Sequence, residues 1–318
     1  MQFQARVSPG SLGVLAATAA AVTWGFTGIF VSKSVTEPLL LTFYRLWLAA
    51  ALMLGASLLR RRMITWAVFR SAIPAGVFLS VNLVLYVFAF RLTDVATASV
   101  IGALQPAIVL LLAGPLLGET ATWRDLSWTA LATIGVVTVV LGSGRSGGNH
   151  LNGDLFATVG TLAFVGYWLA GKRARLEVGA FEYTSAVWLV AAIAITPVTL
   201  IFGPPLGQVA GGDWRWIVLL AVVPGSGHLL MIWAHRAVDA AVSAMIGTGN
   251  VIVAATAAMT FLRQRLTAIE IAGGLVAVAA IAVLATRQAR RSQVSLDDCV
   301  LGRPGRVGPL GCPGVLSA

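Results

Sequence analysis

The sequence predicts an all-α integral membrane protein with ten transmembrane helices, arranged as two inverted five-helix repeats. The chain of 318 residues is 58% hydrophobic and only 11% charged, with a mean hydropathy of +0.88, whereas a soluble domain carries roughly 25% charged residues. Apolar runs long enough to cross a bilayer recur along the chain, without the alternation of polar and apolar residues that barrel strands show. A duplicated pattern of residues, described next, supplies the two repeats.

The duplication is seen when the numbering is shifted by 145 positions. The first copy runs from Arg91 to Leu141 and holds two apolar runs, 96–117 and 126–141, on either side of a polar hinge at 118–125. The matching positions are Arg91 and Arg236, Asp94 and Asp239, Ile101-Gly102 and Ile246-Gly247, Leu117 and Leu262, Thr122 and Thr267, and Asp125 and Glu270. This register indicates a duplicated helical hairpin and therefore a duplicated protein.

Ten apolar segments are predicted to span the membrane, because a spanning helix needs about 20 residues. They are 12–31, 38–59, 71–90, 96–117, 126–142, 154–171, 182–202, 216–235, 240–262 and 267–286. The predicted organisation is a first repeat at 1–145, an inter-repeat loop at 146–153 and a second repeat at 154–288. The Gly/Pro-rich tail at 289–318 is expected to be disordered.

The charge distribution predicts the orientation in the membrane. The net charge is +10. The basic residues lie in the loops between the apolar runs, so they are expected to orient the protein in the membrane rather than to bind nucleic acid. With the N-terminus cytoplasmic, 15 basic residues fall inside and 6 outside, so both termini are expected in the cytoplasm and the protein in the cell (plasma or inner) membrane. Five helices per repeat is an odd number, which inverts the second repeat relative to the first, as in alternating-access transporters.

Arg45 is the one basic residue well inside a predicted span, about 10 Å from the predicted outer end of its helix at ~1.5 Å per residue. A charge at this depth is a candidate contact for an anion or a carboxylate. The alternative is a structural arginine that extends toward the interface or binds loop carbonyls. The sequence leaves both interpretations open.

Other polar residues also fall near the predicted midplane. His228 follows Pro224-Gly225-Ser226-Gly227, where a break or kink of the helix is expected, and broken helices are common at binding sites. The alternative is a packing kink. Gln105 and Asn250 are equivalent in the two repeats, and each amide either lines a polar cavity or bonds a neighbouring helix.

Asn82 and Tyr86 are four residues apart and therefore share one helix face. Together with Trp24, these residues predict a substrate cavity between the first, third and fourth helices of one repeat and their counterparts in the other. Such a cavity, aromatic and weakly charged, suits a small neutral or zwitterionic solute. Aromatic residues are also common anchors at the membrane interface, which is the competing interpretation for Trp24.

The chain resembles the EamA-type members of the drug/metabolite transporter superfamily over residues of about 10–288. The matching residues are Ala20-Ala21-Val22-Thr23-Trp24-Gly25, Arg45, Asn82-x3-Tyr86, Pro106, Leu117-Gly118-Glu119-x2-Thr122 and Gly135. The resemblance implies a secondary transporter, an exporter or exchanger of a small metabolite such as an amino acid or a drug-like solute. No cofactor or metal is expected, because the only cysteines, Cys299 and Cys312, lie in the tail without a CxxC motif.

An intramembrane hydrolase or protease is the alternative function. Gly144-x-Ser146-x-Gly148 matches the G-x-S-x-G pattern of hydrolases, but that motif requires a strand–turn–helix context that an inter-repeat loop does not offer. Ser226 and His228 are two apart on one helix and are therefore expected to point in different directions.

Overall fold

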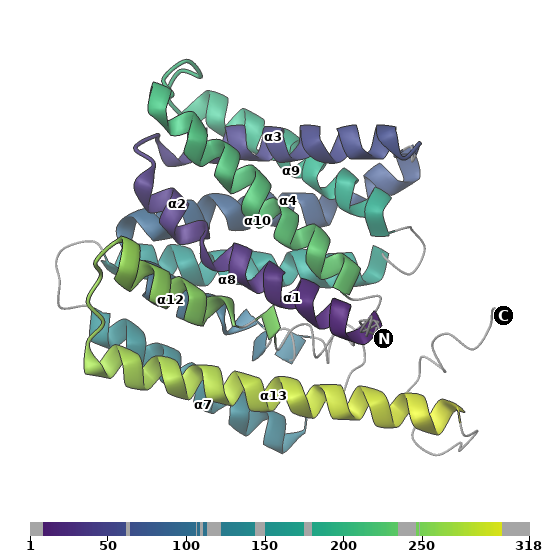
Figure 1. Cartoon of the computed structure of the whole chain (residues 1–318), viewed down its shortest axis with the longest axis vertical. Coiled ribbons are helices and arrows are strands. Elements are labelled where there is room, and N and C mark those ends of the chain that lie inside the picture. Colours follow the sequence, from purple (N-terminus) through teal and green to yellow (C-terminus); the bar gives the residue numbers. More distant parts are fainter. Residues whose placement is uncertain are drawn as a thin grey trace, which may run out of the picture.

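The computed structural model describes residues 9–61, 64–105, 107–108, 111–112, 122–143, 150–174, 180–234, 246–247 and 249–300, and every regular element in that part is a helix. The first half contains α1 (Pro9–Gly25), α2 (Thr27–Lys33), α3 (Pro38–Leu59), α4 (Trp66–Leu92), α5 (Val95–Gly102) and α7 (Trp123–Ser143). The second half contains α8 (His150–Ala174), α9 (Ala180–Phe202), the 3₁₀ helix η1 (Gly211–Asp213), α10 (Trp214–Ala234), α12 (Asn250–Phe261) and α13 (Ala268–Val300). The helices form one bundle (Figure 1).

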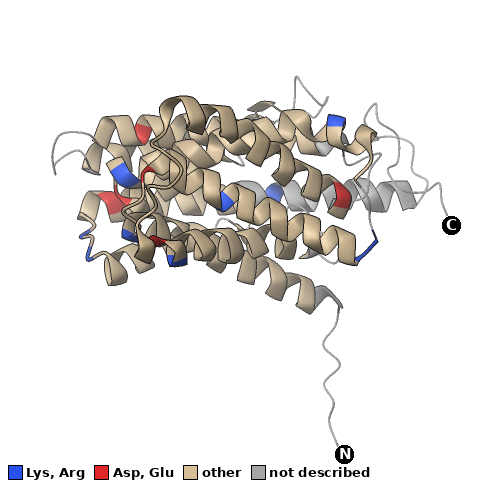
Figure 2. Cartoon of the chain, turned by 90° about the horizontal axis from the view of Figure 1, so that it is seen from above, with Lys and Arg blue, Asp and Glu red and all other residues tan. Residues whose placement is uncertain are grey.

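Seven helical stretches are long and apolar enough to cross a bilayer, so the chain is a multi-pass membrane protein. They are Leu12–Lys33, Pro38–Leu59, Trp66–Leu92, Trp123–Gly142, His150–Gly171, Phe181–Phe202 and Gly211–Met231, and each overlaps a predicted segment. Two further apolar helices are shorter, Asn250–Phe261 and Ala268–Val283. Within the part drawn in colour, charged residues lie mostly toward the ends of the bundle (Figure 2).

Several predicted boundaries differ in the structure. The fourth and ninth segments are not continuous helices, because α5 ends at Gly102 and α12 begins at Asn250, inside the predicted runs. Helix α8 begins at His150, within the predicted inter-repeat loop. Helix α13 continues to Val300, so residues 289–300 of the tail are helical rather than disordered. The stretch after Thr286 is rich in Arg and Gln, which favour helix, and residues 301–318 lie outside the described part.

The two halves of the chain pack against each other throughout the bundle. Helix α4 packs on α8 and α9, and α1 packs on α10 and α12. Helices α3 and α9 run antiparallel, since the Ser57 hydroxyl lies 3.0 Å from that of Ser185 near one end and Trp47 Nε1 donates to Thr196 Oγ1 at 3.0 Å further along. Any cavity in the middle of the bundle is therefore bounded by both halves.

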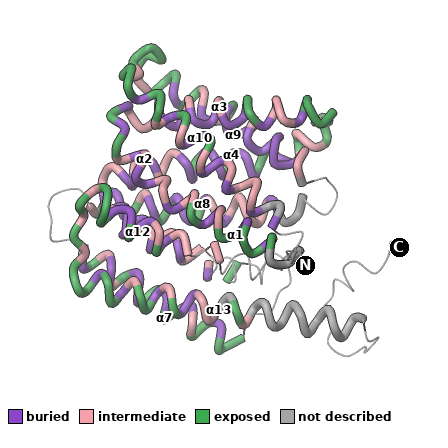
Figure 3. Tube along the Cα trace, in the orientation of Figure 1, coloured by how far each residue is buried: buried purple, intermediate pink, exposed green. Residues whose placement is uncertain are grey.

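Helices α7 and α13 form a pair along one edge of the bundle (Figure 1). A Cβ on Gly135 would lie 2.6 Å from the backbone nitrogen of Ala277 and 2.7 Å from the carbonyl oxygen of Gly273, so glycine permits this close contact. Exposed residues recur along both helices (Figure 3). They include Ile134, which is 60% exposed, and Leu275, which is 67% exposed. This apolar outer face suits contact with lipid.

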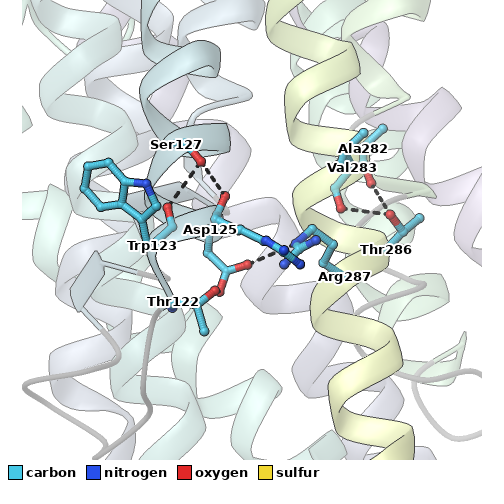
Figure 4. Close-up of polar contacts among 9 residues, drawn as sticks. Thr122, Trp123, Asp125, Ser127, Ala282, Val283, Thr286 and Arg287 are labelled. Atoms are coloured by element: carbon cyan, nitrogen blue, oxygen red, sulfur yellow. Dashed lines mark hydrogen bonds and ion pairs between the residues drawn. The ribbon is translucent and has the colours of Figure 1, made fainter.

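The first turns of α7 and α13 share a capping arrangement. Asp125 Oδ2 accepts hydrogen bonds from the backbone nitrogen of Thr122 at 3.0 Å and from its hydroxyl at 2.6 Å. Glu270 Oε2 accepts from the backbone nitrogen of Thr267 at 2.6 Å. Arg287 Nε, on α13, donates to Asp125 Oδ1 at 3.3 Å (Figure 4). The two caps lie at opposite ends of this helix pair, which is antiparallel because Asp125 contacts Arg287 while Gly142 contacts Glu270.

Candidate functional site

A cavity of about 200 Å³ lies between helices α1, α3, α4, α5, α8, α10 and α12. It occupies the place that the sequence analysis predicted between the two halves, with α3 as an additional wall. All of the predicted site residues line it: Trp24, Arg45, Asn82, Tyr86, Gln105, His228 and Asn250. The remaining lining in the described part of the chain is largely aromatic, aliphatic or hydroxyl-bearing, which makes the cavity mixed in character.

Arg45 reaches the cavity from α3, whose start is fixed by Glu37. The Glu37 carboxylate caps the helix by accepting hydrogen bonds from the backbone nitrogens of Leu39 and Leu40 at 2.8 and 3.2 Å. The Arg45 side chain is only 2% exposed, and its Nε has no hydrogen-bond partner. Within the described residues, no carboxylate or carbonyl accepts a hydrogen bond from its guanidinium. This buried cation is therefore available to a ligand in the cavity.

His228 is held between two indole rings. Its ring centroid lies 5.1 Å from that of Trp24 and 5.4 Å from that of Trp188, the latter in an edge-on arrangement. Trp24 also donates from Nε1 to the carbonyl oxygen of Pro224 at 3.2 Å. Helix α10 runs through Pro224 without interruption, so the expected break is absent. Trp188, 3% exposed behind His228, was not predicted to belong to the site.

Asn82 and Tyr86 lie on the cavity side of α4 and are fixed by α8. Asn82 Nδ2 donates to the carbonyl oxygen of Gly160 at 2.9 Å. The Tyr86 hydroxyl lies 2.8 Å from Thr161 Oγ1. Thr161 gives its one hydroxyl proton to the carbonyl oxygen of Ala157 at 2.8 Å, so Tyr86 is the donor in its pair with Thr161.

Close packing also fixes Tyr86 from two further directions. A Cβ on Gly102 would collide with the Tyr86 hydroxyl, and a Cβ on Gly160 would lie 2.9 Å from its ring. The sequence marked Gly102 only as part of the duplicated pattern and did not single out Gly160, because their contacts with Tyr86 depend on which helices meet. The tyrosine oxygen is thus held in one position in the wall.

Gln105 and Asn250 line the cavity where the helices of the two halves are interrupted. The backbone nitrogen of Leu104 donates to the carbonyl oxygen of Ile101 at 3.1 Å, and that of Gly249 donates to Ile246 at 3.0 Å. Both hydrogen bonds join a backbone N–H to the carbonyl three residues earlier, instead of four as in an α-helix. They lie at equivalent positions, 145 residues apart. Helix interruptions within a membrane are common at transport sites, where freed backbone groups face the cavity.

At the predicted outer end, Asp213 joins η1 to the connection between α2 and α3. Its Oδ2 accepts hydrogen bonds from the hydroxyl of Ser34 at 2.9 Å, the backbone nitrogen of Val35 at 2.7 Å, and the backbone nitrogen and hydroxyl of Thr36, both at 2.7 Å. Arg91 donates to the carbonyl oxygen of Thr36 at 2.9 Å. The sequence analysis did not identify this cluster.

Aromatic pairs close the same end of the bundle. The rings of Tyr44 and Trp214 are 4.9 Å apart and those of Phe30 and Trp216 are 6.2 Å apart. The cavity is lined by Gly25 and Thr27 of the first span but not by Phe30. The Asp213 cluster and these ring pairs therefore lie together at one end of the bundle, beyond the part of the first span that lines the cavity.

Of the two serines of the alternative hydrolase, the structure describes Ser226, whose hydroxyl is bonded within its own helix. Ser226 Oγ donates to the carbonyl oxygen of Val223 at 2.7 Å within its own helix. Among the described residues, no imidazole forms a hydrogen bond with the Ser226 hydroxyl. Ser146 and Glu119 lie outside the described part of the chain.

Comparison with known proteins supports the same class. The model of the EamA-like transporter family matches residues 11–141 and 151–286, one match for each half. A solved structure titled "Crystal structure of protein" superimposes with a TM-score of 0.64 at 21% identity, over 89% of this chain and 100% of that chain. At this identity, the likeness shows the fold alone. No curated protein matches. With matches that cover both halves, the chain belongs to the EamA-like transporter family.

Proposed function

We propose that this protein is a secondary transporter that moves a small metabolite by alternating access, as an exporter or exchanger. The main supporting observation is that Arg45 lines the cavity and its buried Nε forms no hydrogen bond with any described residue. A charged group within a membrane span is costly unless a partner or a polar cavity compensates it. A structural arginine would bind loop carbonyls or another side chain, and Arg45 forms no such bond with any described residue.

The architecture supports alternating access. The cavity is bounded by both halves of the chain, and the helices that carry Gln105 and Asn250 are interrupted at equivalent positions. In inverted-repeat transporters, the halves rock about a site near the midplane. Interruptions beside that site provide places where the helices can bend.

The volume of the cavity favours a metabolite over a larger drug-like molecule. At about 200 Å³, it is smaller than the ~300–1,000 Å³ typical of pockets for drug-sized ligands. A solute of amino-acid size matches this volume better.

We place the protein in the plasma or inner membrane with both termini cytoplasmic. The excess of basic residues on one side supports this orientation. In that orientation the Asp213 cluster lies at the outer end of the bundle, and we propose that it holds this end closed. The proposed cycle opens this end when the solute is released.

Uptake into proteoliposomes tests the proposal. Purified protein is reconstituted, exposed to a metabolite extract with and without a proton gradient, and the trapped solutes are identified by mass spectrometry. We expect at least one metabolite to be enriched over protein-free vesicles, with Arg45→Ala impaired and Arg45→Lys partly active, because lysine keeps the charge but loses the guanidinium fork. Protein abundance and melting temperature identify variants that simply fail to fold. No enrichment by the wild type, or full activity of Arg45→Ala, would contradict the proposal.

A further inference from the structure

We propose that the transported solute carries one net negative charge, on a carboxylate or a similar singly charged oxyanion that pairs with Arg45. This inference rests on the proposed function and defines its substrate class. It replaces the expectation from sequence of a neutral or zwitterionic solute, because that expectation did not include the charge balance of the cavity.

The described lining of the cavity holds one formal charge, that of Arg45, when His228 is uncharged. No aspartate or glutamate belongs to the described lining, and the 2% exposed guanidinium has no ion-pair partner there. Uncompensated charge in a low-dielectric interior is unfavourable. A solute of charge −1 makes the loaded site neutral, whereas a zwitterion leaves +1, a dianion leaves −1 and a cation gives +2.

Two hydroxyl groups of the lining, those of Tyr86 and Ser99, determine which groups the rest of the solute should carry. The Tyr86 hydroxyl donates its proton to Thr161 Oγ1. Ser99 Oγ likewise donates its proton to the carbonyl oxygen of Val95 at 2.7 Å. Both oxygens therefore present only lone pairs. A neutral hydroxyl or amide N–H on the solute would satisfy them without adding charge. The inferred class is a small monoanion with a neutral hydrogen-bond donor, such as a hydroxy acid.

This charge has a consequence for the energy source. An inside-negative membrane potential drives a monoanion outward, at ~2.3 kcal/mol per charge per 100 mV, which corresponds to about tenfold in the equilibrium gradient for each ~60 mV. Export of such a solute does not require a coupled proton. The sequence likewise places no Asp or Glu in the middle of any predicted span.

The test sorts transported solutes by charge. Proteoliposomes containing the whole protein take up a metabolite extract under a potassium diffusion potential, set by valinomycin to inside-positive or inside-negative. We expect the enriched solutes to be monoanions at the assay pH. Their accumulation should rise about tenfold for each ~60 mV of inside-positive potential.

Variants at Arg45 connect the charge preference to this residue. Arg45→Gln should lower monoanion uptake about tenfold or more, as expected for loss of a charged hydrogen bond, while Arg45→Lys should keep the preference for monoanions at a lower rate. The matched control is Arg70→Gln, because Arg70 is exposed on α4 and absent from the cavity lining. It should transport like the wild type.

Each outcome decides the question. If the wild type enriches zwitterions, neutral solutes, cations or dianions, or if monoanion accumulation ignores the potential, the charge inference is wrong while transport stands. If nothing is enriched at either potential, the proposed function fails and the inference fails with it. A folding defect in Arg45→Gln does not affect the decision, because wild-type selectivity alone can overturn the inference.

Discussion

Replacing Asp213 by alanine should weaken the closure of the predicted outer end. The carboxylate is 5% exposed and joins η1 to the connection between α2 and α3. One of its oxygens accepts all four hydrogen bonds from Ser34, Val35 and Thr36. Without it, the hydroxyls can rotate to other acceptors and the Thr36 N–H keeps only its longer bond to Ser34 Oγ at 3.3 Å, while the Val35 N–H has no acceptor left among those bonds.

The magnitude follows from those two N–H groups. A buried donor without an acceptor costs about 1–3 kcal/mol. The Thr36 N–H is buried but keeps a longer bond to Ser34 Oγ, and the Val35 N–H is only partly buried, so we expect Asp213→Ala to cost about 1–3 kcal/mol in total. At ~2–4 °C per kcal/mol for large domains, the melting temperature should fall by roughly 2–12 °C. Asp213→Asn keeps a neutral acceptor and should lose about half as much.

Two measurements check this prediction. The first is the melting temperature of the detergent-purified variants by intrinsic fluorescence, with Ser34→Ala, which removes one donor, as a milder comparison. The second is labelling of a cysteine at Thr27, which lines the cavity, by an impermeant thiol reagent applied from outside. Asp213→Ala should label faster than the parent. Unchanged melting together with unchanged labelling would refute the assigned role.

Three further predictions concern packing, the cavity and topology. Gly135→Ala should destabilise the protein by about 1–3 kcal/mol through overpacking against α13, whereas Gly55→Ala, which meets nothing within 4 Å, should be neutral or stabilising in thermal melts. Gln105→Leu should raise KM or abolish transport without lowering membrane insertion, and normal kinetics would remove it from the site. In whole cells with the native cysteines replaced, an impermeant reagent should label Ser146→Cys but not Ala174→Cys, and the reverse pattern would invert the topology.

Most of the helices could be predicted from the sequence, because each apolar run has to bury or shield its backbone in the bilayer. The interruptions next to Gln105 and Asn250 were not predicted, although Gly102 and Pro106 flank the first and Gly247 and Gly249 stand at the second. Such residues weaken a helix, but they do not show by themselves where it ends. Of the break or kink expected at Pro224, the break does not occur, since α10 continues through the proline. A proline signals a missing donor, but the surrounding helices decide whether the helix breaks.

Part of the cavity lining could be predicted from the chemical character of single residues in the apolar runs. Polar groups within apolar runs have a high free energy when they face lipid, so they are expected to point inward. This argument predicted Arg45, Asn82 and Gln105 as lining residues. Trp188 and Thr161 were not predicted, because their roles arise from packing between the two halves. The role of Asp213 could not be predicted either, because its hydrogen bonds are formed with residues 34–36, which are distant in the sequence.

The most direct measurement is protection of cavity positions by a transported solute. Single cysteines at positions 82, 105 and 250 are labelled in proteoliposomes with and without a saturating concentration of a solute identified by the uptake experiment. If the cavity around Arg45 is the transport site, the solute should slow labelling at these positions. Equal labelling rates with and without the solute at all three positions would place the transport site elsewhere and contradict the account.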